Sequence, residues 1–234
     1  MANYILVHGA WHGGWCWYKT VAGLEALGHH VHAPDLPGHG VRPGDQRMAN
    51  YVAAIVDLVE TMDGPVNLVG HSLGGLVITR VAETIPERIG NLVFLAAFLA
   101  EDGQTCLQAG AEDKQTTLGQ TVIRIPETDY STVDPEAAKR AFYGQSPRED
   151  LVLAAMLRVN QHKEPISTPI HWTKERFGSV PRAYIECRRD RAIGIDHQRH
   201  MLQRFDCRLL ASLDSDHSPF FSDPAALVSA LDAL

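Results

Sequence analysis

The chain of 234 residues is 45% hydrophobic and 21% charged, a composition typical of a globular protein that buries one large core. Its formal net charge of −7 and the absence of a Lys/Arg run argue against a nucleic-acid partner, which would need a basic face. The longest apolar run, residues 92–100, is too short to cross a bilayer, and no signal-peptide pattern is present. We therefore expect a cytoplasmic protein without a membrane partner.

Short apolar runs alternate with amphipathic stretches over most of the chain. The runs predict strands at 4–7, 30–33, 66–69, 92–97, 183–187 and 208–213. The amphipathic stretches predict helices at 15–27, 50–62, 73–85 and 224–234, and Asp223 is placed to cap the last of them. This order predicts an α/β fold with a mostly parallel sheet of about six strands, flanked by helices on both faces.

Residues 98–175 interrupt this alternation. They carry few strand signals, two helix-like stretches at 135–143 and 147–159, and prolines at 126, 165 and 169. An insertion that follows a strand and then returns to the earlier pattern is expected to cover the carboxyl edge of the sheet, where open α/β sheets bind ligands. We predict a core formed by 1–97 and 176–234, with 98–175 as a helical lid.

The segment VNLVGHSLGGLVI, residues 66–78, places Ser72 between Gly70 and Gly74 at the end of a predicted strand and the start of a predicted helix. A nucleophile elbow needs this context, because a serine on a strained turn tolerates only very small neighbours two residues away. The N–H groups at the start of the helix then face developing negative charge. The alternative is a glycine-rich turn without chemistry.

A serine hydroxyl is a weak nucleophile unless a base accepts its proton, and in this fold the chain order is serine, acid, histidine. His217, in the loop DSDHSPF after the last predicted strand, stands where the base is expected. The other downstream candidates lie in the lid or in a predicted helix, where the helical pair is expected at the surface; they are His162, His171, His197 and His200.

The acid is expected at the end of the preceding strand. Asp190 lies just beyond the strand in RAYIECRRD, 27 residues before His217, and would hold the imidazole tautomer. The alternative interpretation is that Asp190 is a solvated charge among neighbouring arginines. The remaining candidates for the acid are Asp196, Asp214, Asp216, Glu101 and Asp102.

An oxyanion hole requires two backbone N–H groups. Leu73, directly after the proposed nucleophile, is expected to supply one. Ala10, in the loop HGAWHGGW after the first strand, is expected to supply the other, because Gly9 lets that loop pass close to the serine.

The sequence predicts no metal and no cofactor. The clustered His29, His30, His32 and His39 lack an evident further ligand, and neither a dinucleotide fingerprint nor a P-loop is present. The cysteines form no C-x-x-C pair and are expected as free thiols in a reducing compartment; they are Cys16, Cys106, Cys187 and Cys207.

These motifs together resemble the α/β-hydrolase superfamily, and within it the group of plant methyl esterases, plant hydroxynitrile lyases and their bacterial esterase relatives, including pyrethroid hydrolases. The stretches that carry the resemblance are LVHGAWHGGWCWYK, GHHVHAPDLPGHG, LVGHSLGG, LVFLAAF, RFGSVPRAYIECRRD and DHSPFFSDP. The resemblance implies a serine esterase with Ser72, Asp190 and His217 as the triad and Ala10 and Leu73 as the oxyanion hole.

The resemblance also bears on the alternative activity. The lyases of this group carry Thr or Asn where this chain has Gly9, and one lyase group carries Lys where it has Ser218. Both departures favour ester hydrolysis over cyanohydrin cleavage. A non-hydrolytic enzyme on the same triad, or a ligand receptor, are the other hypotheses.

The substrate is expected to be a small or medium apolar ester. Trp11 in the oxyanion loop and three aromatic residues in or near the lid, Phe142, Tyr143 and Trp172, are candidate substrate contacts, although ordinary packing explains each of them as well. The only partner we expect is this small molecule, and a homodimer is left open.

Overall fold

A computed structural model describes residues 1–234. Its centre is a six-stranded sheet in the order β2-β1-β3-β4-β8-β9, in which every neighbouring pair is parallel. The strands are β1 (Asn3–Val7), β2 (His30–His32), β3 (Val66–His71), β4 (Ile89–Leu95), β8 (Arg182–Cys187) and β9 (Arg208–Leu213). All six predicted strands are confirmed, with ends displaced by a few residues.

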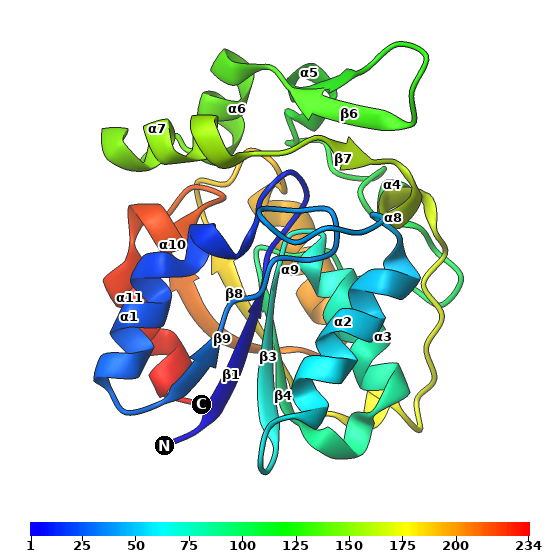
Figure 1. The fold of residues 1–234 in the computed structure, drawn as a ribbon, viewed down its shortest axis with the longest axis vertical. Coiled ribbons are helices and arrows are strands. Elements are labelled where there is room, and N and C mark those ends of the chain that lie inside the picture. Colours follow the sequence, from blue (N-terminus) through cyan, green and yellow to red (C-terminus); the bar gives the residue numbers. More distant parts are fainter.

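Helices cover both faces of this sheet, as Figure 1 shows. Helices α1 (Tyr18–Ala26) and α11 (Pro224–Asp232) pack together on one face, and α2 (Met48–Glu60) and α3 (Gly74–Thr84) on the other. Two more helices, α9 (Ile195–Arg204) and the short α10 (Pro219–Ser222), belong to the C-terminal part. Asp223 caps α11 as predicted, because its carboxylate accepts the Ala226 N–H at 3.3 Å.

The four predicted helices are confirmed, with one difference at the first. The stretch predicted as one helix over 15–27 is a 3₁₀-helix, η1 (Gly14–Trp17), followed by α1. Two further 3₁₀-helices are η2 (Pro86–Arg88) and η3 (Phe177–Ser179). None of the helices combines the length and the apolar character that a membrane crossing needs.

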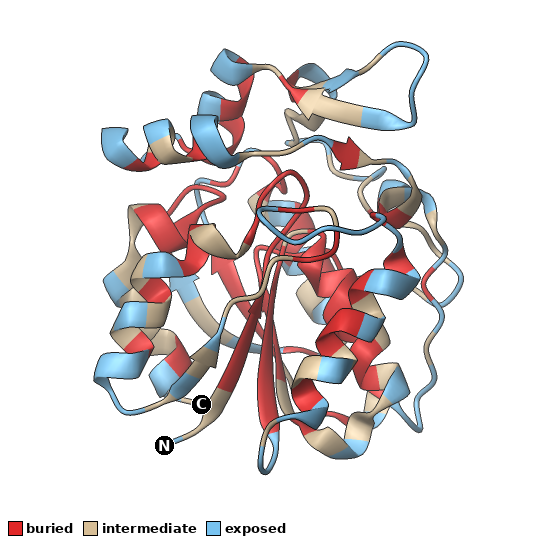
Figure 2. Cartoon of the chain, in the orientation of Figure 1, coloured by how far each residue is buried: buried red, intermediate tan, exposed pale blue.

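The core lies between the two helical layers and the sheet. Strand β3 is buried at all of its positions, and the inner residues of β1 and β4 are buried with it (Figure 2). Helix α3, which follows β3, is buried along most of its length. The turn that carries Ser72 therefore joins two of the most buried elements of the chain. The four cysteines are free and buried, as predicted for thiols that form no disulfide.

The insertion between β4 and β8 lies over one end of the sheet (Figure 1). Its helices are α4 (Cys106–Ala109), α5 (Leu118–Thr121), α6 (Pro135–Phe142), α7 (Arg148–Leu157) and α8 (Glu164–Ser167). The two predicted helical stretches correspond to α6 and α7. The segment also contains a small antiparallel sheet, in the order β5 (Val122–Arg124), β6 (Tyr130–Val133) and β7 (Gln161–His162), that was not predicted. Its strands have only two to four residues each, too few to show an alternating pattern.

The topology fixes where loops of different parts of the chain meet. The chain runs from β1 outward to β2 and then returns to the other side of β1 with β3, so the strand order reverses between β1 and β3. The loops after β1, β3, β8 and β9 emerge at the carboxyl edge, beneath the insertion (Figure 1). A crevice at such a reversal is where open α/β sheets bind ligands.

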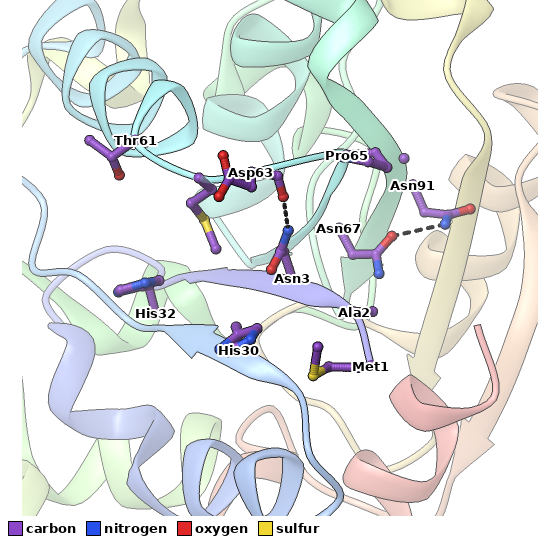
Figure 3. Close-up of a pocket in the computed structure, with 12 residues that line it drawn as sticks. Met1, Ala2, Asn3, His30, His32, Thr61, Asp63, Pro65, Asn67 and Asn91 are labelled. Atoms are coloured by element: carbon purple, nitrogen blue, oxygen red, sulfur yellow. Dashed lines mark hydrogen bonds between the residues drawn. The ribbon is translucent and has the colours of Figure 1, made fainter.

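The opposite edge of the sheet carries a separate polar hollow of about 680 Å³, drawn in Figure 3. His30 and His32 of the predicted histidine cluster lie there, together with asparagines from three strands: Asn3, Asn67 and Asn91. Asn91 donates a hydrogen bond to Asn67 at 2.9 Å. Nowhere does the protein bring three His, Cys, Asp or Glu side chains into a metal-binding arrangement.

Candidate active site

Ser72 occupies the tight turn between β3 and α3 with a φ of 53°, in the left-handed region that a residue other than glycine rarely adopts. Its two glycine neighbours are required by the backbone itself. A Cβ on Gly70 would lie 2.6 Å from the Gly74 carbonyl oxygen, and a Cβ on Gly74 would lie 2.6 Å from that of Val7. The turn therefore has the strain and the close approach expected of a nucleophile elbow.

The loop after β1 passes directly over this serine. A Cβ on Gly9 would lie 2.8 Å from the Ser72 Cβ, so no larger residue fits there without a shift. The next residue, Ala10, and the residue after the serine, Leu73, have backbone N–H groups that donate no hydrogen bond within the protein. Both residues are buried and line the same cavity as Ser72. Two unpaired donors beside the serine are what an oxyanion hole requires.

Asp190 and His217 form a buried pair. His217 Nδ1 lies 2.7 Å from Asp190 Oδ2, and the side chains are 3% and 0% exposed, respectively. The other carboxylate oxygen accepts the N–H groups of Ala192 and Ile193 at 2.7 and 2.9 Å. With Nδ1–H directed to the carboxylate, His217 Nε2 carries the lone pair of the neutral ring.

Opposing effects act on the Asp190 carboxyl. Its pKa is raised overall, because burial has the largest effect; the interaction with His217 and the two backbone N–H groups lowers the pKa in part. The amide of Gln198 adds another donor at 3.2 Å to the same oxygen that binds His217. A carboxyl group surrounded by donors is suited to accept hydrogen bonds as an anion, which favours the orientation of His217 described above.

His71, the residue before Ser72, connects the nucleophile turn to the histidine loop. Its Nε2 donates to the backbone carbonyl of His217 at 2.7 Å, and the two rings lie 4.5 Å apart. Burial lowers the pKa of His71 far below its ordinary range, and the nearby His217 acts in the same direction, so this imidazole is neutral. The structure thereby brings Ser72 and His217, 145 positions apart in the sequence, to the same place.

The other acid candidates are occupied elsewhere. Asp214 forms an ion pair with Arg189 at 2.7 Å on the surface, and Asp196 accepts from Gln115 at 2.8 Å. Buried Asp216 accepts the N–H of Gln145 from the insertion at 2.7 Å. Glu101 and Asp102 pair with Arg204 and His171, also outside the site. Asp190 alone among the candidates contacts His217.

The other base candidates also lie apart from the serine. His171 is exposed and pairs with Asp102, and His162 belongs to β7. The expectation that His197 and His200 are both surface residues is wrong for His197. That residue lies on the inner side of α9 and is 7% exposed, whereas His200 is exposed.

A cavity of about 400 Å³ opens beside Ser72, between the core and the insertion. Its lining is mainly apolar and comes from both regions; the lining side chains include Phe98, Leu107, Leu118, Val122 and Ile166. Two of the predicted substrate contacts, Trp11 and Phe142, line it. The Phe142 ring also packs against the His217 ring at 5.6 Å.

The other two predicted substrate contacts lie elsewhere. Trp172 packs on Phe177, with ring centroids 5.1 Å apart, and its indole N–H donates to the Ala100 carbonyl at 2.9 Å, so it does not reach the cavity. Tyr143 is buried behind the lining, and its hydroxyl lies 2.6 Å from His12 Nε2. Their hydrogen bonds direct both side chains to protein groups, which a sequence pattern does not show.

His8 and His12, for which the sequence predicts no role, both hold the loop that carries Ala10. His8 Nδ1 donates to the Gly9 carbonyl at 2.8 Å, and His8 Nε2 accepts the Leu36 N–H at 3.0 Å. Burial lowers the pKa of both imidazoles, that of His12 to about 3. The signal that could have identified them is their position in the loop after the first strand. A neutral histidine buried there can donate one hydrogen bond and accept another.

Comparisons with known proteins agree with this architecture. Residues 4–230 match the family described as the alpha/beta hydrolase family. Methylesterase 7 of Arabidopsis thaliana is 34% identical over 245 residues, covering 98% of this chain and 94% of that protein. A second relative, Methylesterase 1 of the same plant, is 33% identical over 243 residues, covering 96% of this chain and 92% of its own length.

Solved structures give the same assignment. The pyrethroid hydrolase of Sphingobium faniae JZ-2 superposes with a TM-score of 0.87 at 29% identity, covering 99% of this chain and 96% of that one. The chain therefore belongs to the α/β-hydrolase family, in its plant methylesterase-like group, and is a carboxylic ester hydrolase.

Proposed function

We propose that the protein is a serine carboxylesterase that hydrolyses small to medium apolar esters through an acyl-enzyme. The observation that carries the proposal is the strained Ser72, at a φ of 53°, beside two unpaired N–H groups and the buried His217–Asp190 pair. A backbone outlier of this kind persists only where the surrounding structure maintains it, and such outliers concentrate at active sites.

In the proposed reaction, His217 Nε2 takes the proton of Ser72 Oγ as the oxygen attacks the ester carbonyl carbon. The carbonyl oxygen becomes an oxyanion and accepts the N–H groups of Ala10 and Leu73. Collapse of this intermediate breaks the bond to the alkoxy oxygen, which receives the proton from His217 and leaves as the alcohol. Asp190 stabilises the imidazolium in between.

The second half of the reaction repeats these steps with water. His217 takes a proton from water, the resulting hydroxide oxygen attacks the acyl carbon, and Ser72 Oγ leaves with the proton returned by His217. The structure contains no hydrogen bond between Ser72 Oγ and His217. Contacts of this kind often tighten only in the substrate complex, so we expect this one to form on binding.

The cavity supports an ester with an apolar group. Its volume of about 400 Å³ is at the lower end of the range for ligand pockets, and its lining is mainly apolar. The names of the relatives, methylesterases and a pyrethroid hydrolase, also point to carboxylic esters. Gly9 disfavours the lyase alternative, because the side chain at this position in the lyases has no room beside Ser72 Cβ.

Two parts of the earlier interpretation remain proposals with this function. We propose that 98–175 acts as a lid over the cavity, since lining side chains such as Leu118 and Phe142 come from it. We also propose a cytoplasmic location.

The test is the variant Ser72→Ala with p-nitrophenyl esters of short acids. We expect hydrolysis to fall to the level of the uncatalysed reaction while circular dichroism stays that of the wild type. The matched control is Ser167→Ala, an exposed serine in α8, which should retain full activity. Hydrolysis by Ser72→Ala at the wild-type rate would overturn the proposal.

Labelling with a fluorophosphonate identifies the residue that carries the acyl group, and a panel of esters narrows the class of substrate. A fluorophosphonate should add its mass to the tryptic peptide that contains Ser72, and not in the Ser72→Ala variant. A panel of methyl, aryl and pyrethroid-type esters then ranks the acids and alcohols by kcat/KM. Labelling at another residue would contradict the assignment of the nucleophile.

A further inference from the structure

Tyr143 and His12 form a buried hydrogen-bond chain that ends on the oxyanion loop. Tyr143 Oη lies 2.6 Å from His12 Nε2, and His12 Nδ1 lies 2.8 Å from the carbonyl oxygen of Ala10. The two side chains belong to residues that are 3% and 2% exposed, respectively. Since a carbonyl only accepts, His12 Nδ1 carries the hydrogen, and the neutral ring must accept at Nε2. The chain therefore runs in one direction, from the tyrosine hydroxyl to the Ala10 carbonyl.

The peptide at the end of this chain is strained. Trp11 has a φ of 61°, in the left-handed region, which a bulky residue adopts only with support from its surroundings. His12 holds the carbonyl side of the Ala10–Trp11 peptide, and Gln161 Oε1 accepts the Trp11 N–H at 3.4 Å on the other side. The adjoining peptide carries the Ala10 N–H that faces the cavity.

Both supports reach back to the insertion rather than to the core. Tyr143 ends α6, and Gln161 lies in β7. The backbone of Trp11 is also fixed by the insertion through the Val159 N–H, which donates to the Trp11 carbonyl at 3.0 Å. The geometry of a loop in the core thus depends on contacts made by residues more than a hundred positions later.

The same turn between α6 and α7 also holds the loop of the catalytic histidine. Gln145 N–H and Ser146 Oγ donate to Asp216 Oδ2 at 2.7 and 3.1 Å. The other oxygen of Asp216 accepts the Ser218 N–H at 2.9 Å, so these bonds flank His217 on both sides. One short segment of the insertion therefore contacts the oxyanion loop and the base loop together.

We propose that Tyr143 is a positioning residue of the esterase site, whose hydroxyl acts through His12 to hold the Ala10–Trp11 peptide and so aims the Ala10 N–H at the oxyanion. The proposal rests on the proposed esterase function. It assigns to Tyr143 a role in kcat rather than in substrate binding, because the side chain does not line the cavity.

The experiment measures kcat and KM of Tyr143→Phe with p-nitrophenyl butyrate. The substitution keeps the ring and its packing and removes only the hydroxyl. We expect kcat to fall about tenfold with KM within about twofold, because an oxyanion donor acts mainly in the transition state. Tyr4→Phe is the matched control: Tyr4 is also buried, and its hydroxyl donates to the Leu231 carbonyl at 2.7 Å, away from the site.

A double-mutant cycle tests whether the hydroxyl acts through His12. In His12→Asn, the side-chain amide replaces the Nδ1–H donor to Ala10 but is too short to reach Tyr143. Adding Tyr143→Phe to this background should change kcat by less than about twofold. Circular dichroism and thermal unfolding of each variant confirm that it is folded.

Three results would overturn the proposal: wild-type kcat in Tyr143→Phe, an equal loss of kcat in Tyr4→Phe, or an undiminished tenfold effect in the His12→Asn background. They are distinguishable from failure of the esterase mechanism. In that case Ser72→Ala, measured in parallel, would itself remain active.

Discussion

The sheet core and the insertion are held together by different kinds of contact. The core consists of parallel strands and helices whose inner faces are apolar, with β3 buried at every position. The insertion shares the apolar cluster of the core through residues such as Phe142 and Ala154, and it is attached in addition through buried polar groups. Asp150 of α7 is fully buried and binds Lys19 at 2.6 Å and the Tyr18 hydroxyl at 2.8 Å.

Further hydrogen bonds join the insertion to the core along the boundary between them. Glu164 accepts the Met48 N–H at 2.7 Å, and Gln161 donates to Gln46 at 3.1 Å. Each such bond contributes about 0.5–1.5 kcal/mol net, and its loss leaves a buried group unpaired. The comparison shows that the apolar periodicity of the sequence specifies the fold of the core. Individual donors and acceptors fix the position of the insertion on it.

The largest expected effect distinguishes two buried aspartates of the core: Asp190, which contacts His217, and Asp216, which binds the insertion through Gln145 and Ser146. In Asp190→Asn, an amide faces His217 Nδ1 and selects the wrong tautomer, so we expect kcat to fall about 10⁴-fold. In Asp216→Asn, an NH2 group replaces one of the two accepting oxygens, so the bonds from Gln145 and Ser146 or those on the other oxygen are lost. The free energy of unfolding should fall by about 1–3 kcal/mol, with a much smaller loss of kcat.

Steady-state kinetics and denaturant unfolding of both variants test this comparison. If the two substitutions reduced kcat equally, the assignment of Asp190 as the only acid of the site would be wrong. Asp214→Asn, which changes an exposed aspartate paired with Arg189, is the control and should leave both quantities unchanged within error.

The second prediction concerns acid sensitivity of the core. Burial lowers the pKa of four imidazoles below the ordinary 6.5; they are those of His8, His12, His39 and His71. The unfolded chain therefore binds protons that the folded chain does not as the pH falls below about 6.5. Stability that is complete above this pH is then lost at about 1.4 kcal/mol per pH unit for each proton.

Denaturant unfolding between about pH 5 and pH 7.5 measures this slope. We expect it to approach about three protons near pH 5 from His8, His12 and His71, with a further contribution from His39. His12→Asn should reduce it by about one proton. His171→Gln, which changes an exposed histidine of the insertion, should not alter it. A free energy of unfolding that is independent of pH over this interval would contradict the neutral state of the buried rings.

The third prediction compares two glycines. Gly70→Ala places a Cβ 2.6 Å from the Gly74 carbonyl, and since backbone cannot move aside cheaply, we expect a loss of about 1–3 kcal/mol together with a loss of activity. Gly119→Ala in α5 of the insertion meets no atom within 4 Å and should change stability by less than about 1 kcal/mol. Thermal unfolding of both variants gives the comparison, and equal melting temperatures would refute it.

The smallest effect distinguishes two aromatic residues. Phe142→Leu removes part of the cavity lining, and we expect KM for an apolar ester to rise about fivefold, corresponding to about 1 kcal/mol of lost apolar contact. Trp172 lies outside the cavity, so Trp172→Phe should leave KM within about twofold of the wild type. A rise in KM for Trp172→Phe alone would restore its predicted role as a substrate contact.

Much of the core was predictable because its signals are local. A buried parallel strand is a short apolar run, and the run at 66–69 is followed within six residues by the glycines that the elbow needs. Family resemblance then supplied the order of Ser72, Asp190 and His217. The structure brings Asp190 and His217 into contact and places Ser72 next to the histidine loop.

The insertion was less predictable because its signals are not local. Strand β6 pairs through Tyr130 with His162, some thirty residues away, and neither strand has an apolar face long enough to show a period of two. The sequence around a residue such as Tyr143 is the same whether its side chain lines a cavity or donates to a histidine. Only the position of its hydroxyl relative to His12 decides between these roles.

The sequence by itself determined the order of strands and helices along the chain, the glycines around Ser72 and the candidates for the triad. Each of these is imposed by sterics or burial within a few residues. The tertiary structure alone decided which aspartate meets His217, which aromatic residues reach the cavity and what holds the oxyanion loop. Those choices depend on hydrogen bonds between segments distant in the sequence, 27 residues apart for Asp190 and His217 and 131 for Tyr143 and His12. The direction and length of these bonds exist only once the chain is folded.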